Sequence, residues 1–402
     1  MTEIDLRSDI DRVFARMVDT RRALHRRPEL AFAEHETTRL IRERLDELGL
    51  LPRPGAGTTG AVAMLLGGRP GRTVLLRADI DGLPITEGTG LEFSSELAGA
   101  MHACGHDAHT AGLLGAAEAM ASRAVELPGR YLFVFQPAEE QMSGAREMLD
   151  AGLLEESPVD VAVGWHVTTA LPVGVVKIRE GLAMSDAQGL RITFRGSGGH
   201  AARGGPNVLV SAATVLTSLE SVVAGLEYEG AASVCSAGVV RGGTAMNVVP
   251  TEAVIEGSLR TFTGEQKEEA LDRLSRLVAE AAATAGAEGG VELTLHAPAV
   301  RNDQVVTGAV AETARRLLGS DRVISGPPIT PSDDVSEILS RVPGCYFHVG
   351  GQRADGGSGD HHSPRFDIDE ESMRTGAIIM AEAAVTLAMS ASPARPMDAI
   401  SP

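Results

Sequence analysis

Hydrophobic residues along the first 185 positions alternate between helical spacing and short continuous runs. Residues 4–48 carry two amphipathic helical patterns that are interrupted at Pro28. Helical patterns also occur after Thr110 and at Gly144–Leu149. Short apolar runs bounded by turn residues predict strands at Ala61–Leu66, Thr73–Arg77, Tyr131–Gln136 and Val161–Trp165. Strands that alternate with helices predict a mostly parallel sheet covered by helices on both faces, that is, an α/β domain.

The pattern changes near Asp186 and returns to its earlier form after Ala297. Between these points it predicts strand, helix, strand, strand, helix and strand, the order of a split ferredoxin-like unit. The Ala- and Gly-rich stretch 281–290 is expected to end the second helix and to form a loop. The sequence thus predicts a discontinuous α/β domain of residues 1–185 and 298–402, interrupted by an α+β domain of residues 186–297.

Composition and charge exclude several classes of partner. The net charge of −18 repels nucleic-acid phosphates and anionic membranes, and aromatic residues make up only 3% of the chain. No stretch is long and apolar enough to span a membrane. The N-terminal residues are charged and lack an apolar signal-peptide core. Three widely spaced cysteines form no disulfide framework, so we expect a cytoplasmic protein without nucleic-acid or membrane partners.

The segment Met101–Thr110, MHACGHDAHT, contains three histidines and a cysteine and runs directly into a helical pattern. Cys104 and His106 are suitable ligands for zinc, manganese, cobalt or nickel, although short Cys/His clusters also occur by chance. Further polar residues follow the predicted strands, and ligands bind beyond the carboxyl ends of the strands in an open parallel sheet. The residues that can meet at this edge are Cys104, His106, Glu139, Glu140, His166 and His362.

Three imidazoles, a thiolate and one carboxylate provide more donors than a single tetrahedral ion needs. The sequence therefore predicts two metal ions close together, with one acidic residue left over. In the pair Glu139–Glu140, one residue can ligate a metal while its neighbour moves protons. Taken alone, the pair could be a solvated turn and His166 a core histidine; the convergence of several strand ends favours a metal site.

Eight segments resemble the aminoacylase/carboxypeptidase family of dinuclear metallohydrolases, in its amidohydrolase branch of hippurate, N-acyl-amino-acid and auxin-conjugate hydrolases. The matching segments are LHRRPELAFAEHETTRLI, RADIDGLPITE, MHACGHDAHTAGLLGAA, FQPAEE, GWHV, GSGGHAA, MNVVPTEAVIEGSLRTF and HHSPRFDIDEE. The resemblance implies two divalent ions per chain (Zn, Mn, Co or Ni), with Glu139 as general base and acid. The ligands that it implies are Cys104, His106, Glu140, His166 and His362.

The same resemblance implies that residues 186–297 form a lid and dimerisation domain, and therefore a homodimer. His200 matches a lid histidine that stabilises an oxyanion, often in the partner's site. Asn247 and Arg260 match positions near the substrate's carboxylate. Without the resemblance, His200 would be interpreted as a surface histidine among glycines. Arg260 would be interpreted as one partner of a surface ion pair. Asp79 and Asp81 are expected to orient ligands rather than to bind metal.

The resulting prediction is a metal-dependent amidohydrolase that cleaves the amide bond of N-acyl amino acids or related small conjugates. A dipeptidase or carboxypeptidase that uses the same site is one alternative. A binding protein that has lost turnover is another, although such a protein has no need of a proton carrier beside the ligands.

Overall fold

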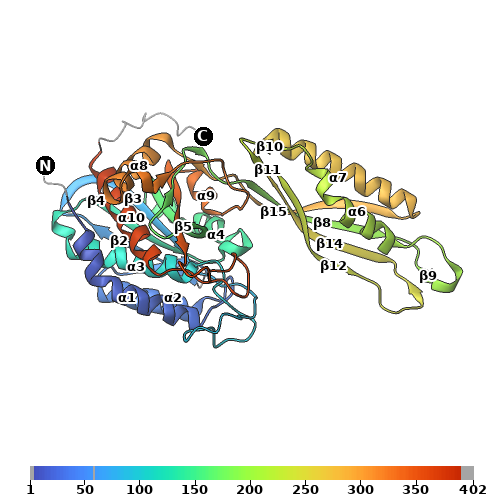
Figure 1. Ribbon diagram of the computed structural model, residues 1–402, viewed down its shortest axis with the longest axis horizontal. Helices are drawn as coiled ribbons and strands as arrows, with labels where there is room; N and C mark the ends of the chain where they lie inside the picture. The colour runs from blue at the N-terminus through green and yellow to red at the C-terminus, as the bar shows by residue number, and fades with distance from the viewer. Residues whose placement is uncertain (1–3, 58, 391–402) are drawn as a thin grey trace. The chain divides into compact units, whose positions relative to one another are not determined.

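The computed structural model describes residues 4–57 and 59–390, and these divide into two compact units. The first unit comprises the described residues of 1–181, 301–326 and 337–402. The second comprises residues 182–300 and 327–336, so the chain leaves the first unit and returns to it. Figure 1 traces this path by colour, with the second unit in green to orange. Each unit is described separately below.

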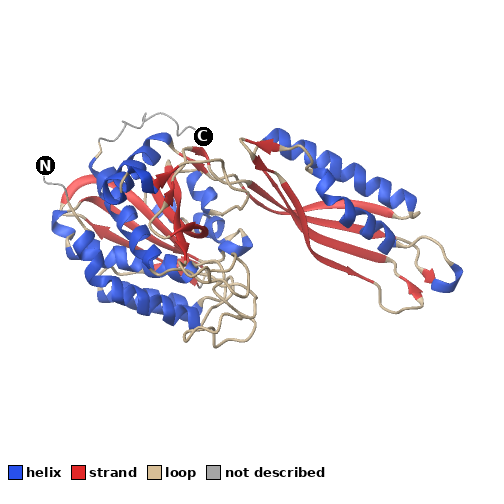
Figure 2. Ribbon diagram, in the orientation of Figure 1, coloured by secondary structure: helices blue, strands red, loops and turns tan. Residues whose placement is uncertain are grey.

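The first unit is a layered α/β structure with helices beside a twisted sheet (Figure 2). Its helices are α1 (Arg7–Arg26), α2 (His35–Glu47), α3 (His106–Ser122), α4 (Gly144–Asp150), α5 (Leu153–Glu156), α8 (Gln304–Leu318), α9 (Val335–Leu339, whose first two residues group with the second unit) and α10 (Glu371–Met389). Its strands are β1 (Arg53–Ala56), β2 (Thr59–Leu66), β3 (Arg69–Asp79), β4 (Pro128–Gln136), β5 (Val161–Pro172), β6 (Val176–Lys177), β16 (Arg301–Asn302), β17 (Val323–Ile324) and β18 (Gly344–Gln352). β7 (Gly181–Leu182) stands where the chain passes to the second unit.

Eight strands form the central sheet in the order β1-β2-β4-β3-β5-β18-β6-β17. The pairs β4/β3, β3/β5 and β5/β18 are parallel, whereas β1/β2 and β2/β4 are antiparallel at one edge. The predicted α/β fold with a mostly parallel sheet is confirmed. Parallel strands place their carboxyl ends at one edge, so β3, β4 and β5 deliver their following residues to the same side.

Side chains along the central strands point alternately to the two faces of the sheet, and the apolar ones form a core on each face. In β3, Val74 and Leu76 join the larger core with α1, α2, α3, α8 and α10, whereas Leu75 joins the smaller core with α4 and α5. Phe133 and Leu132 of β4 divide in the same way. Side chains both above and below the sheet are therefore apolar, which explains the continuous hydrophobic runs in the sequence.

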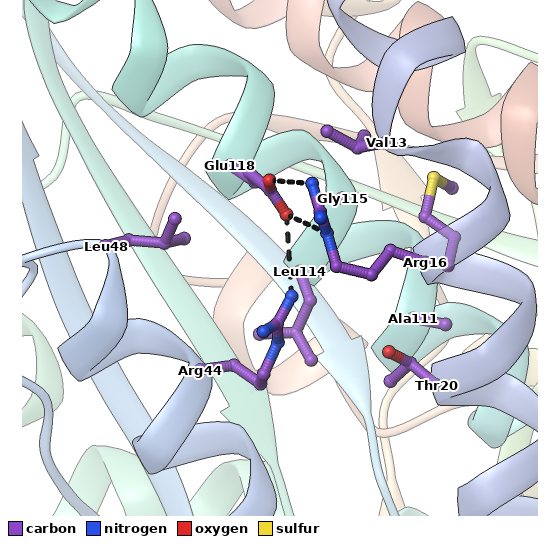
Figure 3. A pocket seen from close by; sticks show the side chains of 10 residues that line it. Val13, Arg16, Thr20, Arg44, Leu48, Ala111, Leu114, Gly115 and Glu118 are labelled. Carbon is purple, nitrogen blue, oxygen red and sulfur yellow. Dashed lines mark hydrogen bonds and ion pairs between the residues drawn. The ribbon is translucent and has the colours of Figure 1, made fainter.

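Glu118 links three of the helices that cover the larger core, α1, α2 and α3. Its carboxylate accepts hydrogen bonds from Arg16 of α1 and lies 3.6 Å from the guanidinium of Arg44 of α2 (Figure 3). Glu118 itself belongs to α3, the helix that begins at His106. These contacts link α1 and α2 to the helix that carries the candidate site at its N-terminus.

The second unit consists of a four-stranded antiparallel sheet and two helices. The sheet has the order β12-β14-β8-β15, from β8 (Asp186–Arg195), β12 (Val234–Gly242), β14 (Glu252–Thr261) and β15 (Glu288–Ala297). The helices are α6 (Val208–Val222) and α7 (Gly264–Thr284), and both pack on this sheet. Short strands complete the unit: β9 (Gly199–His200), β10 (Glu227–Tyr228), β11 (Ala231–Ala232) and β13 (Val248–Val249).

No helix within residues 4–57 and 59–390 combines the length and the apolar character needed to cross a bilayer.

Candidate metal centre

Six candidate residues lie together in the first unit, on segments that are far apart in the sequence. Cys104 precedes α3, and His106 is its first residue. Glu139 and Glu140 open a short 3₁₀ helix, Glu139–Gln141, directly after β4. His166 lies within β5, which continues to Pro172, so this strand is longer than its apolar run. His362 lies in the loop between β18 and α10.

The donor atoms of these residues are close enough to share metal ions. Cys104 Sγ, a ring nitrogen of His106 and a carboxylate oxygen of Glu140 all lie within 4.8 Å of one another. His166 Nε2 lies 3.5 Å from Cys104 Sγ, and His362 Nε2 lies 3.3 Å from Glu140 Oε1. Cys104 and Glu140 thus connect five potential ligands into one group.

The ring nitrogens of two histidines are arranged for metal binding. His106 Nδ1 donates to the carbonyl oxygen of Asp81 at 2.9 Å, and His166 Nδ1 donates to that of Val167 at 2.6 Å. A carbonyl oxygen only accepts, so Nδ1 carries a proton in each ring, and in the neutral imidazole Nε2 then keeps its lone pair. His106 Nε2 is buried and has no hydrogen-bond partner among the described residues. A divalent cation would satisfy this nitrogen, and the thiol, imidazole and carboxylate donors suit such an ion.

His109 is not available as a ligand, although it lies in the same region. It belongs to a second group of potential donors with Asp79, His106 and His166. Its Nε2 accepts the backbone N–H of Val167 at 2.9 Å, and its Nδ1 donates to Asp79 Oδ1 at 2.6 Å. Both nitrogens are therefore engaged, and His109 supports the segment that carries His166.

His361 also lies at the centre, and the sequence analysis did not single it out. Its Nδ1 lies 3.6 Å from Cys104 Sγ, and its Nε2 accepts the N–H of Thr169 at 3.4 Å. His362, in contrast, is exposed and has a φ of +61°, a left-handed conformation that is uncommon outside glycine. Its backbone N–H donates to the carbonyl of Ala103 at 2.8 Å, which attaches this loop to the Cys104 loop. The adjacent histidines in HHSP were the only signal for His361.

The protonation of the group follows from burial and from its internal contacts. Burial, followed by the charge of Glu140, raises the pKa of the Cys104 thiol. Hydrogen bonds with Cys104 and Glu140 raise the pKa of His362 to about 10. Burial lowers the pKa of His166, which keeps this imidazole neutral. A bound cation would reverse the direction for Cys104, because positive charge favours the thiolate.

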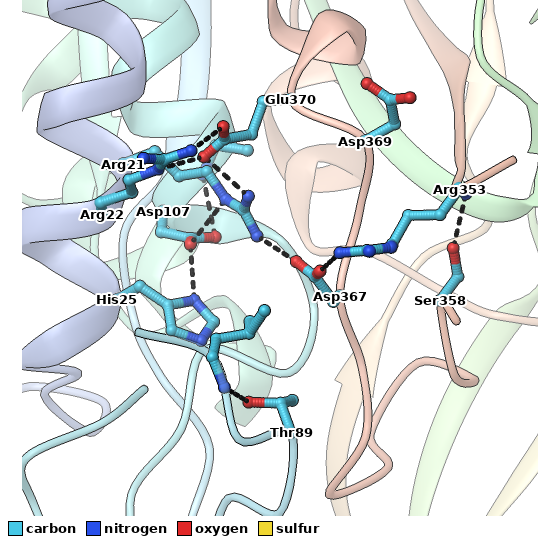
Figure 4. A network of polar contacts seen from close by, with 12 residues as sticks. Arg21, Arg22, His25, Thr89, Asp107, Arg353, Ser358, Asp367, Asp369 and Glu370 are labelled. Atoms are coloured by element: carbon cyan, nitrogen blue, oxygen red, sulfur yellow. Dashed lines mark hydrogen bonds and ion pairs between the residues drawn. The ribbon is translucent and has the colours of Figure 1, made fainter. Parts of the chain in front are cut away.

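A buried ion-pair network supports the two segments that carry the candidate ligands His106 and His362 (Figure 4). Arg21 of α1 is 1% exposed, and its guanidinium lies 3.3 Å from Asp107 and 2.8 Å from Asp367. Asp107 follows His106 directly, and Asp367 lies five residues after His362. Burial opposes ionisation of Asp107, but the charge of Arg21 and a 2.8 Å hydrogen bond from His25 hold the pKa of this carboxyl well below its usual range.

The remaining predicted site residues belong to the second unit. His200 is exposed at the end of β9, which pairs with β13, and its Nδ1 accepts the N–H of Ala202 at 3.1 Å. The carbonyl of Asn247 accepts the N–H of Ala201 at 3.0 Å, so Asn247 is a neighbour of His200. Arg260 lies near the far end of β14, so this unit does not bring it together with His200. The roles of these three residues stay predictions.

Known proteins of similar sequence and fold show the family to which the chain belongs. A family model described as Peptidase family M20/M25/M40 matches residues 75–386. N-acetylcysteine deacetylase of Bacillus subtilis is 36% identical over 93% of this chain and 98% of its own length. IAA-amino acid hydrolase ILR1-like 2 of Arabidopsis thaliana is 35% identical over 93% of this chain and 85% of its own length. The YXEP protein of Bacillus subtilis, described as a dinuclear metal binding peptidase from the M20 family, superposes with a TM-score of 0.77 at 33% identity, over 94% of this chain and 99% of its own.

The family match covers more than half of the chain and includes every residue of the candidate metal centre. The relatives are named hydrolases, and they align over nearly their whole length. The family predicted from the sequence is confirmed. The chain is therefore a hydrolase of the M20/M25/M40 peptidase family.

Proposed function

We propose that this hydrolase cleaves the amide bond of N-acyl amino acids or related small amide conjugates. The observation that carries the proposal is the single group formed by five donor residues and Glu139 in the first unit. The names of two relatives, a deacetylase of N-acetylcysteine and a hydrolase of IAA-amino acids, support a substrate with an acyl group on an amino acid.

Two divalent ions, zinc, manganese, cobalt or nickel, are the cofactors we propose. Cys104, His106, Glu140, His166 and His362 would hold them. When bound, such ions polarise an amide carbonyl and make a water molecule more acidic. The buried Nε2 of His106, which has no hydrogen-bond partner among residues 4–57 and 59–390, supports this assignment.

Glu139 is the group we propose for proton transfer. One carboxylate oxygen of Glu139 and one of Glu140 each lie 3.9 Å from His106 Nε2, so both carboxylates border the same centre. Glu140 also contacts His362, which supports a ligand role for it. Glu139 takes a proton from the attacking water and later gives it to the leaving nitrogen. An amine is a poor leaving group until it is protonated, so one residue in both roles serves the whole reaction.

The test of the proposed function is a substrate panel with metal-reconstituted protein. Chelator-treated protein would be loaded separately with zinc, manganese, cobalt and nickel. Each form would be assayed with N-acetyl, N-benzoyl and indole-acetyl amino acids and with matched dipeptides. We expect at least one metal form to hydrolyse N-acyl amino acids with a kcat/KM above that for every dipeptide. Preference for dipeptides would establish the peptidase alternative instead, and metal loading without any hydrolysis would indicate a binding protein.

We further infer that residues 186–297 act as a ferredoxin-like lid and dimerisation domain, so that the protein is a homodimer. The order β8, α6, β12, β14, α7, β15 supports the ferredoxin-like assignment. β12 is an edge strand, and its Val239 and Val240 are exposed, which suits pairing across a two-fold axis. In this proposal His200 stabilises the oxyanion, and Asn247 and Arg260 bind the substrate's carboxylate.

Hybrid dimers test the lid proposal. His200→Ala should lower turnover by somewhat more than a hundredfold with unchanged metal content, because one oxyanion partner contributes roughly 3 kcal/mol. If His200 serves the partner's site, mixing this variant with inactive Glu139→Gln protein after subunit exchange should restore about a quarter of the wild-type activity, since half of the dimers would contain one intact site. No recovery would mean that His200 acts within its own chain. A monomer in solution would contradict the shared site.

The proposed partner is a small substrate, and the proposed location is the cytoplasm. The strongly negative net charge disfavours nucleic acid and anionic membranes as partners. Cys104, Cys235 and Cys345 all have free thiols, as expected in a reducing compartment.

A further inference from the structure

The turn that presents Glu139 and Glu140 is held by two buried carboxyl groups from distant segments. Glu34 Oε1 accepts the backbone N–H of Ala138 at 2.9 Å. Asp81 Oδ1 accepts the N–H of Glu139 at 3.1 Å, and Asp81 Oδ2 accepts that of Glu140 at 3.0 Å. Glu34 is fully buried and Asp81 is 1% exposed. Three consecutive amides of the turn therefore donate to two carboxyl groups that solvent does not reach.

The backbone of this turn needs such support. Ala138 has a φ of +53°, in the left-handed region that residues with a Cβ rarely adopt. The next two residues begin the 3₁₀ helix, so successive N–H groups converge and form a concave site for an acceptor. The turn is also tightly closed: a Cβ added to Gly144 would lie 1.6 Å from the carbonyl oxygen of Pro137. Loss of an acceptor would leave a buried amide unpaired at a strained position.

We propose that Glu34 is a positioning residue for Glu139: it holds the Ala138 amide and thereby fixes the direction of the Glu139 carboxylate. This inference rests on the proposed function of Glu139 and deepens it. Asp81 contributes to the same turn, but its carbonyl also receives His106 Nδ1, so changing it would disturb a ligand directly. Glu34 contacts the turn through Ala138, so replacing Glu34 tests the positioning of Glu139 separately from metal ligation.

The Ala138 amide requires an acceptor oxygen and not a negative charge. Burial raises the pKa of Glu34, and the neighbouring Asp81 carboxylate acts in the same direction. A glutamine side chain has the same length and keeps a carbonyl oxygen, so Glu34→Gln should retain the contact. Methionine is similar in size and offers no oxygen, so Glu34→Met should lose it.

Thr38 provides a matched control on the neighbouring helix. It lies in α2, is 6% exposed, and its Oγ1 accepts the N–H of Gly60 at 2.9 Å. Thr38→Val removes a buried hydrogen bond between a side chain and the backbone, and this bond has the same length as the one between Glu34 and the Ala138 amide. The volume of the side chain hardly changes. Gly60 packs beside Pro137, but it is not one of the three amides of the turn, and in this variant the Ala138 amide keeps its acceptor Glu34. Thr38→Val should therefore lower thermal stability without affecting proton transfer.

The experiment compares wild type, Glu34→Met, Glu34→Gln and Thr38→Val as metal-loaded full-length proteins. We expect Glu34→Met to lower kcat about tenfold or more. Its KM and metal content should stay within about twofold, because the ligands and the rest of the site remain. Glu34→Gln should keep kcat within about threefold of wild type, and Thr38→Val should do the same. The proposal would be overturned if Glu34→Gln lost as much kcat as Glu34→Met. It would also be overturned if Thr38→Val lost as much kcat as Glu34→Met.

Hydrogen–deuterium exchange supplies a readout that is independent of catalysis. In metal-free protein, Glu34→Met should accelerate exchange in a peptide covering Pro137–Met142, whereas Glu34→Gln and Thr38→Val should not. If wild type proved inactive on every substrate while this exchange pattern held, the proposed function would fail and the positioning contact would stand. Unchanged exchange in Glu34→Met would refute the positioning role whatever the activity.

Discussion

Replacing Glu139 with glutamine should lower kcat by roughly a hundred- to ten-thousand-fold, the range typical of a lost general base. Glutamine has nearly the same shape but cannot accept the proton of the attacking water or return it to the leaving nitrogen. The backbone contact with Asp81 does not involve the side chain, so the turn should persist. Metal content should stay at the wild-type level, because Glu139 is not a proposed ligand.

Steady-state kinetics and elemental analysis of the same preparation check this expectation. Glu147→Gln is the control, because Glu147 is an exposed carboxylate on the adjacent helix α4 and should be replaceable without effect. Glu140→Gln provides the contrast, since it should reduce metal content together with turnover. Activity of Glu139→Gln within a few-fold of wild type would assign proton transfer to another group.

Replacing Cys104 or His362 with alanine should reduce the number of bound metal ions and, with it, turnover. Cys104 Sγ has His166 Nε2 at 3.5 Å and His361 Nδ1 at 3.6 Å, so its removal takes the middle donor from the group. His362 contacts Glu140, so its removal frees one side of that carboxylate. We expect fewer than two ions per chain in each variant. The loss should be larger for Cys104→Ala, since Cys104 lies close to His106, Glu140 and His166, whereas His362 contacts Glu140.

Elemental analysis after dialysis against a fixed concentration of free metal measures this loss. Cys345→Ala is the matched control: Cys345 is a fully buried thiol of β18 in the same unit, outside the donor group, and its removal should leave metal content unchanged. Far-UV circular dichroism would verify that each variant is folded. Wild-type metal content in both Cys104→Ala and His362→Ala would refute the ligand assignment.

The helices and strands followed from the sequence wherever burial is strongly patterned. Alternating side chains of β3 and β4 enter the two cores, and the resulting apolar runs are visible without a structure. One expectation was correct only in part. The stretch 281–290 ends the second helix, since α7 ends at Thr284, but the loop is shorter than expected because β15 begins at Glu288. Gly289 lies in the strand where a Cβ would come within 2.9 Å of Val278 and 3.0 Å of Phe194, so glycine there permits α7 to pack closely on the sheet.

The sequence by itself determined the family of this protein and the potential donors of the centre, because these donors lie in short local motifs. Cys104 and His106 are two residues apart at the start of α3, and Glu139 and Glu140 are adjacent directly after β4. Only the tertiary structure decided how each donor is used. It engages both nitrogens of His109 and leaves Nε2 of His106 without a hydrogen-bond partner in the described part of the chain. It also brings Glu34 to the Ala138 amide across more than a hundred residues. The partner of each donor atom depends on the direction of its side chain and on which buried polar groups remain unpaired after packing. Neither can be predicted from a local pattern of hydrophobic and polar residues.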